Sequence, residues 1–243
     1  MFKIINKIKR GINVFFPSKS SFGSYGKSST FEFPIYISCP KSVYLEGDLR
    51  IRQGTKILIS EKSRLTIKKY SVIGMNNMII PNKHKSTVGI PQILLGISGI
   101  NDQNNQIIIE EDVWTGANVT IMGDITLGRG CVCGACCLVT KDVPPYAIVL
   151  GTPAHIVAVK FSIDQIIEHE KILYPEHERL TRVFLEELFE KYYKDMPIFG
   201  VSTNFTEEQI KRLKYCIEQR NFTHKDYIEK LKIYNKNQNK YNK

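Results

Sequence analysis

The five histidines are the side chains of this sequence best suited to acid–base chemistry, because the imidazole group titrates near neutral pH. They are His84, His155, His169, His177 and His224. Only His84 stands where a regular repeat gives way to an irregular stretch, NKHKSTVGIP. An imidazole at such a junction can take a proton from a hydroxyl group held beside it. The alternative interpretation is a loop histidine without a role.

Four closely spaced cysteines, C-x-C-x2-C-C, could indicate a zinc site. However, Cys131, Cys133 and Cys137 fall on core-facing positions of the repeat described below, where small apolar side chains are expected. Only Cys136 is expected to point outward. We therefore expect no metal site. The sequence also lacks the GxxxxGK[ST] loop that cradles nucleotide phosphates.

The element that must position these groups repeats every six residues. Residues 109–144 divide into the rows IEEDVW, TGANVT, IMGDIT, LGRGCV, CGACCL and VTKDVP. The first position of five rows, and the fifth position of all six, is aliphatic or cysteine. An amphipathic helix would repeat about every 3.6 residues and a strand every two, so neither explains the pattern. Weaker rows begin at Leu45, Ile51 and Ile57, and again at Ile67, Ile73 and Ile79, after a slip in phase.

Rows of this kind predict a triangular prism in which each row is a short strand with its turn. Three rows complete one coil, and stacked coils bury a core that no single coil could bury. First-position and fifth-position side chains face inward. Glycine is expected at the second position, where the chain bends and a Cβ would clash. The twelve rows make about four coils, and residues 85–108 interrupt them as a functional loop.

The run DVWTGANVTIMGDITLGRGCVCGACCLVTKDVPPYAIVLGTPAHIV resembles the last coils of the hexapeptide-repeat acyltransferases. The likeness covers roughly residues 40–195 and is strongest to the xenobiotic and polysaccharide O-acetyltransferase branch. It implies a mostly β protein, a left-handed parallel β-helix with a protruding loop and a C-terminal helical extension. The left hand comes from the resemblance alone, since general crossover rules favour right-handed connections.

The resemblance also implies the site residues. His84 matches the catalytic histidine, which deprotonates the acceptor, and no metal is required. Acetyl-CoA is the co-substrate, and the active sites lie between the subunits of a homotrimer. Asn82 and Asp102 are expected at the acceptor, although Asp102 or a backbone carbonyl could instead orient His84. The expected contacts of coenzyme A are Trp114, Gly116, Ala117, Ala135, Thr140, Lys141 and Lys160. Lys160 is included because His155 stands where the family usually has lysine.

The charge of the chain lies at its two ends. Of the net charge of +10, residues 1–30 carry six basic and no acidic side chains, and residues 201–243 carry ten basic and five acidic ones. The neutral body argues against a nucleic-acid groove. The N-terminal segment either caps the first coil or lies as a basic amphipathic helix on a membrane. We divide the chain into a cap (1–40), a β-helix (41–160) and a helical extension with a basic tail (161–243).

These observations predict an acetyl-CoA-dependent O-acetyltransferase that modifies a sugar hydroxyl, in a surface polysaccharide or its precursor. Two alternatives stay open. The acceptor could be a xenobiotic or a sugar-nucleotide amine, or the prism could be a non-catalytic binding scaffold. The sequence has no secretory signal and no apolar run of about 20 residues. We therefore expect a cytoplasmic protein with reduced cysteines. Peripheral attachment to the inner face of the membrane stays open.

Overall fold

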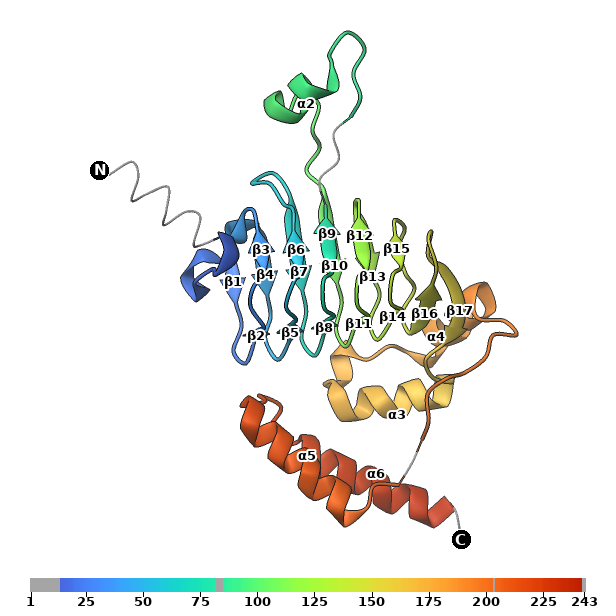
Figure 1. Cartoon of the computed structure of the whole chain (residues 1–243). Helices are drawn as coiled ribbons and strands as arrows, with labels where there is room; N and C mark the ends of the chain where they lie inside the picture. The colour runs from blue at the N-terminus through green and yellow to red at the C-terminus, as the bar shows by residue number, and fades with distance from the viewer. Residues whose placement is uncertain (1–13, 82–84, 203, 242–243) are drawn as a thin grey trace. The chain divides into compact units, whose positions relative to one another are not determined.

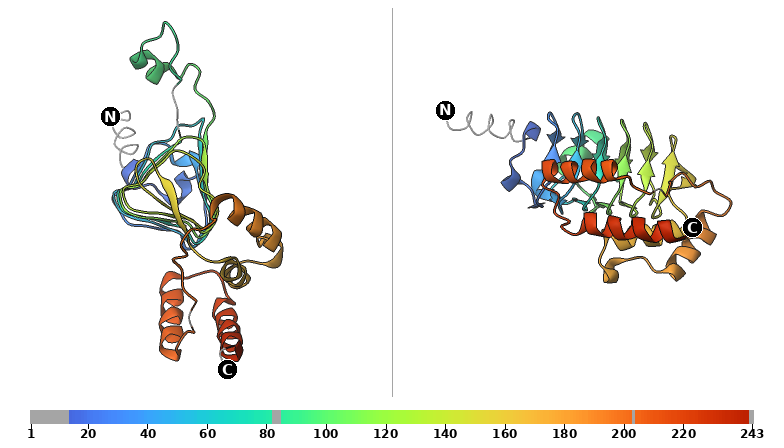
Figure 2. Two further views of the ribbon diagram at one scale, coloured as in Figure 1. Left: turned by 90° about the vertical axis from the view of Figure 1, so that its right-hand side faces the viewer. Right: turned by 90° about the horizontal axis from the view of Figure 1, so that it is seen from below.

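The chain divides into two compact units, Met1–Ile156 and Val157–Lys243, which are described separately. The structure is a computed structural model that describes residues 14–81, 85–202 and 204–241, with side chains up to residue 236. In the first unit, short strands follow one another around three faces of a prism (Figures 1 and 2). Each strand pairs in parallel with the strand three positions further along the chain, apart from the last two strands of sheet B.

We name the three faces sheets A, B and C. Sheet A contains β1 (Ser24–Tyr25), β4 (Val43–Leu45), β7 (Arg64–Ile67), β10 (Gln106–Ile109) and β13 (Ile125–Leu127). Sheet B contains β2 (Thr30–Phe31), β5 (Arg50–Ile51), β8 (Val72–Ile73), β11 (Trp114–Thr115), β14 (Val132–Cys133), β16 (Ala147–Leu150) and β17 (His155–Val159). Sheet C contains β3 (Tyr36–Ile37), β6 (Lys56–Ile57), β9 (Met78–Ile80), β12 (Thr120–Met122) and β15 (Leu138–Val139).

The six-residue columns are confirmed as the core of the prism. All six first-position residues from Ile109 to Val139 are buried, and so are all six fifth-position residues from Val113 to Val143. The register stacks the columns, because Leu45, Ile67, Ile109 and Leu127 pair in turn along sheet A. The inward-facing aliphatic side chains of successive coils therefore form one continuous apolar core.

The bend of each row differs from the prediction. Asp112, Asn118, Gly130 and Cys136 occupy the fourth position of their rows and have φ values of 56°, 58°, 69° and 61°. The left-handed backbone conformation thus lies at the fourth position, where asparagine and aspartate are among the residues that tolerate it. Glycine at the second position serves a different need, the close approach of the neighbouring coil, which is described with the site.

The N-terminal boundary also differs from the predicted one. Strands β1–β3 form a complete coil within residues 24–37, a stretch that the sequence assigned to the cap. Aromatic rings cover this coil, since Phe15 lies 5.5 Å from Tyr36 and Phe16 lies 5.4 Å from Phe33, between ring centroids. The short 3₁₀ turns Lys19–Ser21 and Pro40–Ser42 flank the coil. The amphipathic helix of the N-terminal segment was predicted over residues 2–16, and residues 2–13 of it lie outside the described residues.

The second unit is helical. It contains α3 (Ile163–Leu173), a 3₁₀ turn (Glu176–Glu178), α4 (Arg182–Tyr192), α5 (Glu207–Arg220) and α6 (Tyr227–Tyr241). Capping boxes at Ser162 and Thr206 begin α3 and α5. Helix α4 begins at Arg182, because the Thr181 hydroxyl accepts a hydrogen bond from the backbone N–H of Phe184 and caps the helix there. Among the described residues, no helix is both long enough and apolar enough to cross a membrane.

Candidate functional site

Two corners of the prism carry the residues that the sequence assigned to chemistry. We call the turn between sheets B and C the glycine corner, because Gly74, Gly116 and Gly134 lie there in successive coils. We call the turn between sheets C and A the insertion corner. There, the described residues 85–105 lie outside the prism, between β9 and β10 along the chain (Figure 1).

The glycine corner brings the backbones of neighbouring coils unusually close together. A Cβ on Gly74 would lie 2.2 Å from the carbonyl oxygen of Gly116, and a Cβ on Gly116 would lie 2.6 Å from the backbone nitrogen of Ala135. Ala117 accepts a 2.9 Å hydrogen bond from the backbone N–H of Cys136. The structure therefore brings Gly116, Ala117 and Ala135 together on a ledge of small residues, of which Gly116 and Ala117 are half-buried and Ala135 is exposed.

A buried polar cluster stabilises this corner from inside. The hydroxyl of Thr115 accepts hydrogen bonds from the Gly74 backbone N–H at 3.0 Å and from the Asn77 side-chain amide at 2.5 Å. The amide oxygen of Asn77 accepts a bond from the backbone N–H of Val119 at 2.6 Å. Thr115 and Asn77 are fully buried. The cluster was not predicted, because Thr115 occupies a first-position column that is otherwise aliphatic or cysteine.

Thr140 and Lys141 lie at the insertion corner, one strand away from the glycine corner. Both side chains are exposed. The next residue, Asp142, accepts a 2.7 Å hydrogen bond from the backbone N–H of Thr126, and Asp124 accepts one of 2.8 Å from Gln106 in the coil before. These carboxylates hold the turns so that the ammonium group of Lys141 is presented to solvent.

The insertion carries one short helix, α2 (Gln92–Ser98), with Leu95 buried. Four large apolar side chains of this segment are more than half exposed: Val88, Ile93, Leu94 and Ile97. Asp102 is half-buried beside the end of α2, where its backbone N–H bonds to the carbonyl of Gly99 at 3.2 Å. Asn82 and His84 lie outside the described residues, so the structure does not test their assignment or whether Asp102 orients His84.

A polar groove of about 570 Å³ follows the insertion corner from the base of the insertion toward the N-terminal coils. It was not predicted. Its lining comes from the corner segments of four successive coils: Lys41, Ser42, Tyr44, Glu61, Lys62, Ser63, Arg64, Asn104, Asn105, Gln106 and Asp124. The Arg64 guanidinium lies 3.5 Å from the centroid of the Tyr44 ring and covers it.

Two other predicted contacts occupy separate places. Trp114 is 57% exposed on sheet B, paired with Val72 and Val132, so it is available for contact rather than packed in the core. Lys160 belongs to the second unit, where its ammonium group lies 5.4 Å from the Phe161 ring centroid. Its contact with coenzyme A stays a prediction.

The corner between sheets A and B holds a charged network. Arg129 bonds to Glu111 at 3.1 Å, and Lys68 lies 3.4 Å from Glu111 and 3.0 Å from Glu110. Burial alone would raise the pKa of Glu111. A backbone hydrogen bond and the two cations outweigh it and hold that pKa below its usual range. Burial raises the pKa of Glu110, against the attraction of Lys68. The network ties adjacent coils together.

The cysteines take the positions predicted for them. Cys131, Cys133 and Cys137 are buried, and burial raises the pKa of the Cys137 thiol, whereas Cys136 is exposed in its left-handed turn. Within residues 14–81, 85–202 and 204–241, no group of three or more histidine, cysteine or carboxylate side chains could hold a metal ion.

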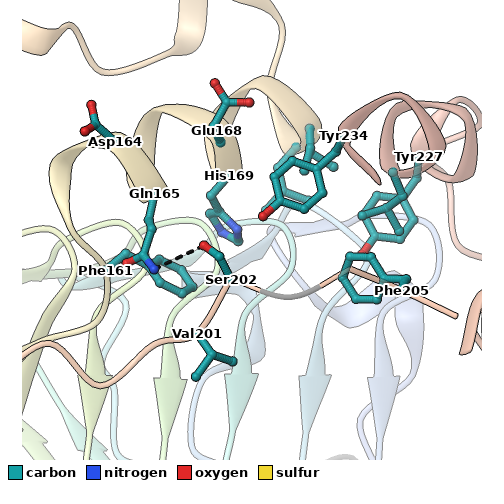
Figure 3. A pocket seen from close by; sticks show the side chains of 13 residues that line it. Phe161, Asp164, Gln165, Glu168, His169, Val201, Ser202, Phe205, Tyr227 and Tyr234 are labelled. Carbon is teal, nitrogen blue, oxygen red and sulfur yellow. Dashed lines mark hydrogen bonds between the residues drawn. The ribbon is translucent and has the colours of Figure 1, made fainter. Parts of the chain in front are cut away.

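The second unit contains a cavity of about 330 Å³ (Figure 3). Gln165 on α3 donates a 3.1 Å hydrogen bond to the hydroxyl of Ser202 across it. His169 packs against Phe161, with 5.1 Å between ring centroids. Aromatic side chains contribute much of the rest of the wall: Phe205, Tyr227 and Tyr234. Nothing at this cavity corresponds to a predicted site residue.

The family model for the bacterial transferase hexapeptide, with six repeats, matches residues 106–141, which run from β10 to the turn after β15. Residues 106–141 therefore resemble the bacterial transferase hexapeptide repeat. The match confirms the repeat inferred from the rows, and it includes Lys141 and two glycines of the glycine corner, Gly116 and Gly134.

Two curated acetyltransferases are similar to parts of this chain. Chloramphenicol acetyltransferase of Agrobacterium fabrum is 51% identical over 59 residues, which are 24% of this chain and 28% of that protein. Galactoside O-acetyltransferase of Escherichia coli is 28% identical over 140 residues, which are 57% of this chain and 64% of that protein. The chain therefore spans less than two thirds of the length of these relatives.

Solved structures of other acetyltransferases share the fold of the prism. A hexapeptide-repeat-containing acetyltransferase of Vibrio cholerae, complexed with acetyl coenzyme A, superposes with a TM-score of 0.54 at 24% identity, over 62% of this chain and 83% of that chain. A galactoside acetyltransferase in complex with coenzyme A gives 0.52 at 20% identity, over 73% and 87%. The likeness confirms the left-handed parallel β-helix fold.

Proposed function

We propose that the chain is an acetyl-CoA-dependent O-acetyltransferase that transfers an acetyl group to a sugar hydroxyl. The observation that carries the proposal is the ledge at the glycine corner, where Gly116, Ala117 and Ala135 lie together in stacked coils and carry only small side chains. An extended thioester arm can lie against such a surface because no long side chain stands in its way. The similar acetyltransferases named above, two of them complexed with coenzyme A or acetyl coenzyme A, support it.

The reaction we propose is a direct transfer without a covalent enzyme intermediate. His84 takes the proton of the acceptor hydroxyl as the oxygen attacks the thioester carbonyl carbon. A backbone N–H stabilises the negative charge that develops on the carbonyl oxygen. The C–S bond then breaks, and the leaving thiolate of coenzyme A takes the proton from the imidazolium. Asn82 and Asp102 are proposed to hold the acceptor.

The remaining contacts of coenzyme A follow from charge and exposure. We propose that Lys141 meets a phosphate group of coenzyme A, because its ammonium group is exposed one turn beyond the ledge. Trp114 is exposed on the strand that leads into Gly116, so it can flank the acetyl group. Lys160 is proposed as a further phosphate contact in place of the lysine that His155 replaces.

We propose that the active unit is a homotrimer with the sites between subunits. The ledge and Lys141 lie at different corners of the same prism. One copy can therefore supply the ledge of a site, and a neighbouring copy can supply Lys141. The insertion also exposes four large apolar side chains, which contact with a second copy would bury: Val88, Ile93, Leu94 and Ile97. We expect sedimentation equilibrium to give the mass of three chains. The mass of one chain at micromolar concentration would contradict the trimer.

The decisive experiment measures free thiol released from acetyl-CoA by the purified protein, with and without added sugars. His84→Ala is expected to lower acceptor-dependent thiol release about 10²- to 10⁴-fold while coenzyme A binding is kept. His177→Ala is the matched control, because that imidazole is 81% exposed in the second unit. Unchanged turnover in His84→Ala would remove His84 from the mechanism. No affinity for coenzyme A would favour a non-catalytic scaffold.

A xenobiotic acceptor is the second candidate, favoured by the 51% identity with a chloramphenicol acetyltransferase. That identity lies within 24% of the chain. Adding chloramphenicol in the same thiol assay separates the two candidates. Thiol release with chloramphenicol but with no saccharide would replace the sugar proposal.

A further inference from the structure

One side chain that lines the groove at the insertion corner is buried, and its amide nitrogen has no hydrogen-bond partner among the described residues. Asn105 lines the groove and is 5% exposed. Its side-chain nitrogen has no hydrogen-bond partner among the described residues, although its backbone carbonyl accepts a 3.0 Å bond from the Arg64 backbone N–H. A buried donor left unpaired costs free energy, and a bound acceptor atom would recover it.

The fold itself does not require an amide at this position. The strand register aligns Ile107 with Leu65 and with Ile125, so the residues two positions earlier, Asn105, Ser63 and Gly123, are equivalent in stacked coils. A hydroxymethyl group or no side chain at all completes the same turn in the neighbouring coils. The donor at Asn105 therefore points to a ligand rather than to packing.

The groove is too long for one small ring. Its lining comes from four successive coils, at Lys41, Glu61, Asn104 and Asp124. Neighbouring strands of a sheet lie about 4.8 Å apart, so three steps between coils give a length of about 14 Å. A chain of several sugar rings fits this length better than a monosaccharide does.

The side chains along the walls of the groove are polar or charged, which disfavours an apolar ligand. Lys41, Lys62 and Glu61 are exposed there, offering donors and acceptors on both sides. The only aromatic ring of the lining, Tyr44, is covered by the Arg64 guanidinium. A ligand with hydroxyl groups, each both donor and acceptor, complements such a surface.

We propose that this groove is a subsite for an oligosaccharide chain, in which the side-chain amide of Asn105 donates a hydrogen bond to a sugar oxygen. The inference rests on the proposed function and narrows it, because it makes the acceptor a glycan of several residues. The groove holds sugars next to the one that is acetylated.

The test measures binding by calorimetry on the full chain, without acetyl-CoA. The probes are malto-, galacto- and chito-oligosaccharides, each from the monosaccharide to the hexasaccharide. At least one series is expected to bind more tightly as it lengthens to three rings and then to level off. Asn105→Ala is expected to weaken that binding about 3- to 10-fold, the usual worth of one hydrogen bond. Gln53→Ala, an exposed amide at the glycine corner, is the matched control.

Because Asn105 is buried, Glu61→Ala on the exposed wall serves as a second variant that leaves the fold intact, and it is also expected to weaken binding. Length-independent affinity, no binding in any series, or equal affinity in Asn105→Ala and Gln53→Ala would overturn the subsite. Thiol release is scored separately. Length-dependent binding without acetyl transfer would keep the subsite and remove the proposed function, whereas transfer to monosaccharides unaffected by Asn105→Ala would do the reverse.

Discussion

Replacing Thr115 by valine tests whether the core of the prism depends on one hydroxyl group. The two side chains have nearly the same shape, and the other first-position residues are aliphatic or cysteine. Hydrophobic patterning alone would therefore expect valine to be tolerated or to stabilise the protein. The structure gives the opposite expectation, because the Thr115 hydroxyl accepts from both the Gly74 backbone N–H and the Asn77 amide.

The magnitude follows from the two donors that lose their acceptor. Both lie in buried residues, where an unsatisfied donor costs about 1–3 kcal/mol. Exchanging a hydroxyl for a methyl group returns about 1 kcal/mol of apolar burial. The net loss in the free energy of unfolding is about 3 kcal/mol. For a chain of this size, 1 kcal/mol shifts Tm by about 2–4 °C, so Thr115→Val should melt about 10 °C lower.

The assay is thermal unfolding followed by circular dichroism, at one protein concentration for all variants, because association affects Tm. Thr120→Val is the control, since this threonine is only half-buried on β12 and its replacement should change stability by less than about 0.5 kcal/mol. A Tm for Thr115→Val equal to or above that of the unmodified chain would refute the account of the buried cluster.

Two further predictions concern the other corners. The carboxylate of Glu111, whose pKa is lowered, stabilises the fold above the usual glutamate range near pH 4.3, and this contribution is lost as the pH falls toward its lowered pKa. Glu111→Gln should therefore cost about 3 kcal/mol in urea unfolding at pH 7, and this cost should shrink as the pH falls below the usual glutamate range; a pH-independent difference would contradict the pairing with Arg129. Gly116→Ala should lower stability by about 1–3 kcal/mol and weaken coenzyme A binding in calorimetry, because its Cβ would meet the Ala135 backbone. Gly96→Ala, where a Cβ meets nothing within 4 Å, is the control, and equal effects of the two would count against the close approach.

Much of the prism could be predicted because its core residues recur as aliphatic side chains every six positions in the sequence. The coil β1–β3 escaped prediction because aromatic and polar residues, such as Phe31, replace the spaced aliphatics there. Its burial depends on ring contacts between residues that the six-residue period does not connect. The site of the left-handed bend was also missed, since Cys136 and Asp112 adopt it without a glycine.

For the candidate site, the sequence indicated Gly116, Ala117 and Ala135, and the structure brings them together. Asn105 could not be found in this way. Its importance comes from burial without a partner, and neither property can be read from an asparagine in the run NDQNNQ. The separation of Lys141 from the ledge by one strand is likewise a property of the turns.

The insertion has a consequence for how such proteins can diversify. Strands β7 and β10 pair residue for residue, from Arg64 with Gln106 to Ile67 with Ile109, although the insertion separates them along the chain. The prism therefore holds both ends of the insertion in place whatever its length. Doubling the length of such a loop adds only about 0.6 kcal/mol of closure entropy. The insertion can therefore be lengthened, shortened or exchanged while the register of the coils on either side of it is kept.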